Sequence, residues 1–286
     1  MTPKGDDPLQ FLTTARVAVV AGKGGVGKTT VTAVLARAAI ARGLRVLVVE
    51  LDGKPVLDDL LAHTVPVQHI SASAALGEYL DTHGLSRVAK RLTTAGIIDV
   101  VATASPGIDD IVVLGKVKQL ERSDLYDLIL IDGPAAGHAI TFLLAAKSLL
   151  STVRGGPIAH QATEVAEMLA DPSRCQVILV TLPETTPVNE AVETAYALEE
   201  QIGVHLGPIV VNAVDMGPQL PADAAPDDSP LRDAAEFRNA RRSLHAGERA
   251  RLADELALPQ LVLSLVPGSA LDADAVTSLA AEWGPS

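Results

Sequence analysis

The stretch from Ala21 to Thr30 reads AGKGGVGKTT and decides the fold. It has the spacing of a phosphate-binding loop, in which a glycine, four residues and a second glycine precede Lys28 and Thr29. The run before it, Val17 to Ala21, is short, apolar and β-branched, which predicts a buried parallel strand. The run after it, Val31 to Ala41, predicts an apolar helix. The sequence therefore predicts strand, loop and helix in the order that such a loop needs.

The chemistry expected of this loop follows from its glycines and its lysine. Residues without a Cβ let backbone N–H groups turn toward phosphate oxygens at the positive end of a helix dipole. We expect Lys28 to reach the β- and γ-phosphates of ATP and the Thr29 hydroxyl to bind Mg²⁺. The alternative is a glycine-rich turn without a ligand. The residues expected to contact the nucleotide here are Gly22, Gly24, Gly25, Val26, Gly27, Lys28, Thr29 and Thr30.

Two further apolar runs end in acidic residues. Leu44 to Val49 predicts a central parallel strand, which would carry Glu50 and Asp52 to the sheet edge that holds the loop. These two acids could instead cap the next helix. Leu128 to Ile131 predicts a second buried strand, and Asp132 at its end would join the Mg²⁺ site. The repeated order of strand and helix predicts an α/β fold, a doubly wound and mostly parallel sheet flanked by helices.

Length and composition limit the domain organisation. The chain has 286 residues, 48% of them hydrophobic and only 2% aromatic, which suits one large α/β domain with an aliphatic core. We expect residues 1–14 to be a flexible leader and residues 15–286 to form a single domain. Within it, residues 60–125 are a candidate client- or partner-facing segment and residues 216–230 a mobile loop. Residues 231–256 predict one or two charged helices, with Gly247 as a candidate break.

Charge and cysteine content disfavour several classes of function. The formal net charge of −12 gives no broad basic surface, so we expect neither nucleic acid nor anionic lipid as a partner. No apolar run is long enough to insert stably in a membrane, and the polar start is unlike a signal peptide, which together predict a cytoplasmic protein. The single cysteine, Cys175, is interpreted as core packing, since it can form neither an internal disulfide nor a CxxC site.

Lys23 follows the first loop glycine, a position that the general pattern leaves open. With it, GKGGVGKTT resembles the deviant phosphate loop of the ParA, MinD, nitrogenase-iron-protein and arsenite-pump ATPases. In those proteins this lysine crosses a dimer interface to the partner's nucleotide, so the resemblance implies the same role for Lys23. The alternative is a solvated loop lysine.

The acidic strand ends resemble the switches of the same superfamily. Asp52 matches the carboxylate that orients the attacking water, although Gly53 and Lys54 depart from the usual first-switch sequence. IDGPAAGH is similar to the second switch, and its glycines at 133 and 137 predict a loop that moves when the γ-phosphate leaves. His138 in that loop is interpreted as a surface or capping histidine.

Two other segments strengthen the resemblance. VVNAVD places Asn212 where the superfamily bonds the adenine ring, and Pro267 follows the last predicted strand, where the family often packs the base. Pro106 to Asp109 resembles a segment ahead of client-facing helices in the arsenite-pump family. The apolar residues after it fit equally a helix packed on the sheet.

Residues 16–267 thus resemble the arsenite-pump ATPases and the related tail-anchored-protein-targeting ATPases, particularly bacterial members that occur as pairs. The resemblance implies a slow Mg²⁺-dependent ATPase that works as a switch, either as a homodimer or with a paralogous partner, on an unknown client. Lys23, Lys28 and Asp52 would be its catalytic residues. A ParA- or MinD-type positioning ATPase shares these residues but would want a basic surface. A metabolic ligase or kinase and an ATP-binding subunit of low activity are further alternatives, while the absence of paired cysteines argues against an iron–sulfur carrier.

Overall fold

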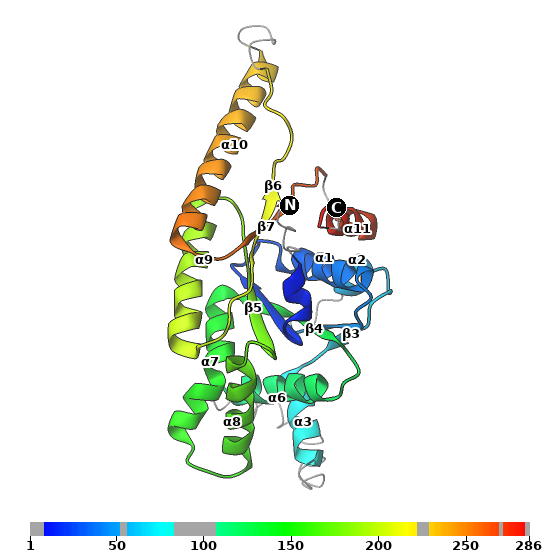
Figure 1. The fold of residues 1–286 in the computed structure, drawn as a ribbon, viewed down its shortest axis with the longest axis vertical. Coiled ribbons are helices and arrows are strands. Elements are labelled where there is room, and N and C mark those ends of the chain that lie inside the picture. The colour runs from blue at the N-terminus through cyan, green and yellow to red at the C-terminus, as the bar shows by residue number, and fades with distance from the viewer. Residues whose placement is uncertain (1–8, 52–55, 83–106, 222–228, 269–270, 284–286) are drawn as a thin grey trace, which may run out of the picture.

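The computed structural model describes residues 9–51, 56–82, 107–221, 229–268 and 271–283. Within these ranges the chain forms an α/β fold, in which one parallel seven-stranded sheet lies between two layers of helices (Figure 1). The strand order is β3-β2-β4-β1-β5-β6-β7. The strands are β1 (Val17–Gly22), β2 (Val46–Glu50), β3 (Val67–His69), β4 (Leu128–Ala135), β5 (Cys175–Thr181), β6 (Ile209–Val214) and β7 (Gln260–Ser264). The predicted fold class is confirmed.

The two faces of the sheet carry different helices, because successive side chains of a strand point to opposite faces. In β1, Val17 and Val19 belong to one buried cluster, and Ala18 and Val20 to the other. The helices of the first face are α3 (Ala72–Thr82), α6 (Ile108–Arg122), α7 (Ala136–Thr152), α8 (Pro157–Ala170), α9 (Thr185–Ala197), which a π-helical turn (Leu198–Ile202) continues, and α10 (Pro230–Glu255). Those of the second face are α1 (Lys28–Ala41), α2 (Val56–Leu60) and α11 (Ala273–Glu282).

The middle of the sheet is buried throughout, as its continuous apolar runs predicted. All residues of β1, β2 and β5 are buried, and β1 lies between β4 and β5. Cys175 opens β5 with no exposed surface, and burial raises the pKa of its thiol to about 12. The thiol is therefore protonated at neutral pH and packs in the core, as the sequence indicated.

The residues just before β1 belong to the fold, so the interpretation of residues 1–14 as a flexible leader is wrong for residues 9–14. A short 3₁₀ helix covers Gln10–Thr13, and Leu9 and Leu12 have no exposed surface. The Gln176 side chain donates a hydrogen bond of 2.9 Å to the Phe11 carbonyl oxygen. Residues 9–14 are too few for their apolar side chains to show a helical or strand period, so the sequence did not predict that this stretch packs on the domain.

Helix α10 is one unbroken helix of 26 residues that projects beyond the edge of the sheet (Figure 1). Gly247 does not end it, because a glycine in a helix costs only about 1 kcal/mol relative to alanine. Part of the predicted mobile loop runs along this helix, where the Asn239 side chain bonds both the N–H and the carbonyl of Leu220. Residues 222–228 of that loop lie outside the described residues.

Candidate functional site

The predicted phosphate loop connects β1 to the N-terminus of α1, at the carboxyl edge of the sheet. Two of its glycines are required because atoms of neighbouring strands lie too close for a Cβ. A Cβ on Gly22 would lie 2.3 Å from the Val180 carbonyl oxygen of β5, and one on Gly27 would lie 2.3 Å from the Asn212 amide nitrogen of β6. Gly27 also has φ of 89°, a left-handed conformation that favours glycine, and it caps α1. The neighbouring strands therefore fix both ends of the loop.

Asn212 holds the loop from the end of β6. Its amide nitrogen donates to the Val26 carbonyl oxygen at 2.9 Å, and its amide oxygen accepts from the Ala213 N–H at 2.9 Å. An asparagine amide has a second N–H and a second lone pair, so a contact with an adenine edge remains compatible with these bonds. Pro267 is exposed after β7. The adenine roles of Asn212 and Pro267 stay predictions.

Thr29 and Asp132 are brought together, as the magnesium site requires. The Thr29 hydroxyl lies 2.8 Å from one carboxylate oxygen of Asp132, and the Thr32 hydroxyl lies 3.1 Å from the other. A hydroxyl and a carboxylate are hard oxygen ligands of the kind that Mg²⁺ prefers. The donor set therefore fits a magnesium ion held by Thr29 and Asp132. The fully buried Thr32 orients the Asp132 carboxylate through its hydrogen bond to the second oxygen.

The two loop lysines have different contacts. The Lys28 ammonium donates to the Lys23 carbonyl oxygen at 3.3 Å, across the mouth of the loop. The Lys23 ammonium instead forms an ion pair of 2.6 Å with Glu190 of α9, and the two side chains are 39% and 37% exposed. Lys23 therefore has an ionic partner as well as solvent contact, and its role across a dimer interface stays a prediction. The Lys23 side chain contacts Glu190 of the same subunit, a partner that the sequence did not predict.

The acid at the end of β2 lies beside the acid of β4. Glu50 is in register with Asp132, and it is only 6% exposed. Asp52, the expected catalytic carboxylate, lies outside the described residues together with Gly53 and Lys54. Its role stays a prediction, although β2 delivers the chain to the predicted edge of the sheet.

The predicted second-switch loop takes a different form. Gly133 and Pro134 belong to β4, and Gly137 lies in the first turn of α7, so the strand passes directly into the helix. A Cβ on Gly133 would lie 2.4 Å from the Val20 carbonyl oxygen of β1, which explains the glycine by packing rather than by loop mobility. His138 is exposed in the first turn of α7 and lines a cavity of about 360 Å³.

In the candidate client segment, α6 packs its apolar side chains inward. Ile111, Leu114 and Val117 are at most 1% exposed, so this face belongs to the core and not to an open groove. Pro106 and the rest of residues 83–106 lie outside the described residues.

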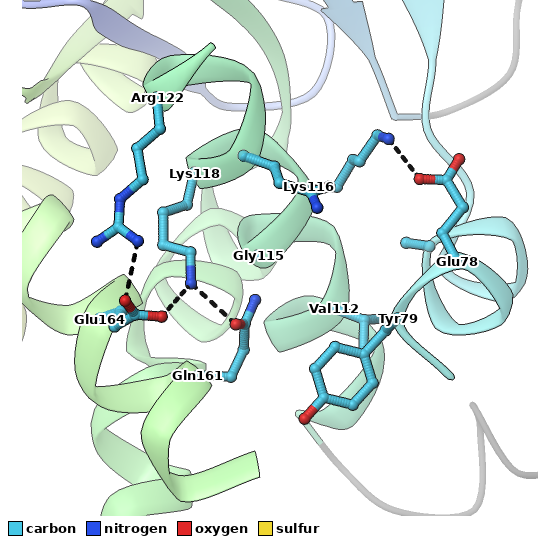
Figure 2. A pocket seen from close by; sticks show the side chains of 11 residues that line it. Glu78, Tyr79, Val112, Gly115, Lys116, Lys118, Arg122, Gln161 and Glu164 are labelled. Atoms are coloured by element: carbon cyan, nitrogen blue, oxygen red, sulfur yellow. Dashed lines mark hydrogen bonds and ion pairs between the residues drawn. The ribbon is translucent and has the colours of Figure 1, made fainter. Parts of the chain in front are cut away.

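A second cavity, of about 280 Å³, lies between α3, α6 and α8, and Figure 2 shows its charged side chains paired with one another. The Lys118 ammonium bonds Glu164 at 2.6 Å and Gln161 at 2.9 Å, and Arg122 bonds Glu164 at 2.9 Å. Gly115 allows this packing, because a Cβ there would lie 1.7 Å from the Gln161 amide nitrogen. These pairs are complete without a ligand, and we interpret them as structural.

No helix in the described part of the chain combines the length and apolar content needed to cross a bilayer.

Comparison with known proteins agrees with the geometry of the loop. Residues 15–154 match the family model described as anion-transporting ATPase. The chain is 32% identical to the ATPase BagA of Mycobacterium tuberculosis over 262 residues, covering 82% of this chain and 74% of the relative. It is 30% identical to an arsenical pump-driving ATPase of Escherichia coli over 202 residues, 67% of this chain and 33% of that protein. It is 25% identical to an ATPase ASNA1 homolog of Cryptosporidium parvum over 275 residues, 80% of this chain and 73% of the relative. Because the chain has a phosphate loop between β1 and α1, a contact between Thr29 and Asp132, and similarity to these relatives, it belongs to the anion-transporting ATPase family and is an ATPase.

Proposed function

We propose that this ATPase is a Mg²⁺-dependent molecular switch, in which ATP closes a dimer and hydrolysis opens it. The observation that carries the proposal is the contact of 2.8 Å between Thr29 and Asp132 beside the phosphate loop. It supports a site where a metal ion and the β- and γ-phosphates meet at the positive end of α1. Bound there, Mg²⁺ would neutralise developing charge on the phosphates.

The residues of the chain would divide the work. The loop N–H groups and the Lys28 ammonium hold the phosphates, and Thr29 and Asp132 hold the ion. Asp52 accepts a hydrogen bond from the attacking water and orients it toward the γ-phosphorus. Positioning and electrostatic stabilisation supply most of the catalysis in phosphoryl transfer, so this set of groups is sufficient for a slow reaction.

Lys23 supports the dimeric part of the proposal. On its own subunit it is bonded to Glu190 at 2.6 Å, and Lys28 bonds the Lys23 carbonyl. In the dimer, Lys23 exchanges Glu190 for phosphate oxygens of the partner subunit's nucleotide. The exchange costs little, because both side chains are more than a third exposed and such ion pairs contribute about 0–1 kcal/mol.

The partner can be a second copy or a paralogous ATPase, and the client is a protein or ligand bound in one nucleotide state. The net charge of −12 supports a cytoplasmic switch over a positioning ATPase that binds nucleic acid or anionic lipid.

Light scattering with and without Mg²⁺-ATP tests the proposal, with phosphate release measured on the same samples. We expect ATP to raise the dimer fraction of the wild type, more strongly in Asp52→Ala, where ATP is bound but not hydrolysed. Thr29→Val should lose the Mg²⁺ dependence of both readouts. Thr163→Val, which removes an exposed hydroxyl of α8, is the matched control.

Two results would contradict a homodimeric switch. Turnover without any change in mass would argue for a monomeric enzyme. A monomer that binds ATP with negligible turnover would argue for a low-activity subunit, and would direct the search to a paralogous partner.

A further inference from the structure

A third cavity, of about 210 Å³, lies between α10 and the carboxyl ends of β6 and β7. Five of its lining residues come from α10, and Asp215 and Leu265 close it just beyond the ends of β6 and β7. The carboxyl ends of parallel strands are where doubly wound sheets bind ligands. No loop residue lines this cavity, nor does Asn212 or Pro267, so it is separate from the proposed nucleotide site.

Two residues that line this cavity each have a buried side-chain nitrogen without a hydrogen-bond partner in the described residues. His245 is 4% exposed, and its Nε2 accepts a hydrogen bond from the Arg241 Nε at 3.3 Å. The proton of the neutral ring is therefore on Nδ1, which is buried and has no hydrogen-bond partner in the described residues. Burial, and then Arg241, lower the pKa of His245, so the ring stays neutral at pH 7. His245 thus presents an N–H donor that lacks an acceptor.

Arg242 adds a guanidinium whose charge interacts with Asp215. Its Nη1 is also buried and without a hydrogen-bond partner in the described part of the chain. The nearby carboxylate of Asp215 is engaged by Arg238, at 2.6 and 2.8 Å, which lowers the pKa of Asp215 to about 2. Unpaired buried donors cost about 1–3 kcal/mol each, and buried polar groups in native proteins are rarely left unpaired.

The rest of the lining is apolar and open. Phe237 is 71% exposed and Leu265 is 44% exposed at the cavity. The cavity is smaller than sites for drug-sized ligands, which are about 300–1,000 Å³. The cavity between α3, α6 and α8 differs, because Lys118, Arg122 and Gln161 are already bonded there.

We propose that the cavity of α10 binds a small organic anion, a carboxylate or other oxyanion on a compact apolar body. The oxyanion accepts hydrogen bonds from Arg242 and from the Nδ1–H of His245, and the apolar body packs against Phe237 and Leu265. A planar ring is well suited to this wall, since aromatic side chains stack on flat partners.

Calorimetric titration of the full-length protein with benzoate, in saturating Mg²⁺-ADP to fill the phosphate loop, tests the site. We expect saturable binding of benzoate and none of benzamide, which has the same shape without the charge. Arg242→Met should weaken benzoate binding by about tenfold or more, as expected for loss of a charged hydrogen bond. Arg249→Met is the matched control, because Arg249 lies on the same helix with a buried unpaired Nε but does not line the cavity.

A second measurement needs no variant. Nitrogen-15 NMR of the histidine side chains should show the Nδ1–H tautomer of His245, with a resonance that shifts along the benzoate titration. Equal benzoate affinity in Arg242→Met and wild type would overturn the proposal. So would the absence of saturable binding both with and without Mg²⁺-ADP, which would leave water as the partner of both donors. Binding seen only without Mg²⁺-ADP would also overturn it, because it would assign benzoate to the nucleotide site.

Discussion

The nucleotide edge of the sheet and the layer of α6 and α8 both contain polar side chains, but they pair them differently. In the helix layer Lys118, Arg122 and Glu164 form a network in which the lysine side chain is 7% exposed and the glutamate 25%. At the centre of this network, Lys118 and Glu164 are largely buried and each has two partners, while Arg122 is 50% exposed. At the nucleotide edge the Lys23 ammonium pairs with Glu190, and its side chain is 39% exposed. The groups proposed to act on a ligand are held by few bonds and stay accessible, and this difference predicts opposite responses to substitution.

The largest effect is expected from Lys28→Ala, which should affect activity but not folding. Loss of the ammonium that neutralises the phosphates should lower ATP hydrolysis by about a hundredfold or more. The melting temperature should stay close to that of the wild type, since substitutions of this kind at accessible positions are usually within about 0.5 kcal/mol. Phosphate release and thermal melting are the measurements, with Lys147→Ala of α7 as the control.

Glu164→Gln should have the opposite effect and lower stability without lowering ATPase activity. Removing one member of a buried ion pair leaves Lys118 uncompensated, which costs about 3 kcal/mol, the lower end of the usual range because Glu164 is a quarter exposed. Urea unfolding measures the loss, and ATP turnover at 25 °C should be retained. Glu167→Gln, an exposed carboxylate of the same helix, should be neutral. A fall in turnover without loss of stability would break the comparison.

The same carboxylate predicts how stability depends on pH. Hydrogen bonds from Lys118, then from Arg122, lower the pKa of Glu164 from 4.5 to about 2. Because the folded-state pKa is depressed, the stabilisation is complete above about pH 4.5 and is lost as the pH falls toward 2. The free energy of unfolding of the wild type should therefore approach that of Glu164→Gln as the pH falls from about 4.5 to 2, each unit of pKa being worth about 1.4 kcal/mol. A constant difference across this range would contradict the assignment.

The smallest effect is expected from Glu190→Gln. If Lys23 of each subunit must leave Glu190 for the partner's nucleotide, weakening this pair in both subunits should favour the dimer by at most about 2 kcal/mol. The protein concentration at which ATP gives half dimer should then fall by up to about thirtyfold. Analytical ultracentrifugation with Mg²⁺-ATP and Asp52→Ala in the background measures it. Glu193→Gln, on the same helix, tests whether helix charge alone is responsible, and an equal shift in both variants would exclude a specific exchange.

Local patterns predicted the parts of the fold that depend on short segments. The loop from Gly22 to Thr29, the buried strands and the position of Asp132 were each predicted from a few adjacent residues, although β4 continues past Asp132 to Ala135. The contact of Thr29 with Asp132 joins residues 103 apart, and it was predicted because parallel strands end at the same edge.

Contacts between distant surfaces could not be predicted in this way. Glu190 reaches Lys23 across 167 residues, and nothing near either residue marks the pair. The contact of Thr32 with Asp132 could not be predicted either, because a threonine inside a helix is a weak helix former and by itself indicates no polar partner. The buried 3₁₀ turn around Leu12 and the continuity of α10 through Gly247 depend on tertiary packing, which overrides local preference.

Helix α10 also has a mechanical consequence. Leu252 is fully buried near its C-terminal end, while Leu231 near the other end is 73% exposed. About 20 residues separate these points, and at 1.5 Å per residue the helix forms a rigid arm of roughly 30 Å. A tilt of α10 by about 5° at Leu252 would displace its other end by about 3 Å. A spin label at position 231 would therefore report a small rotation of the helix as a measurable change in distance.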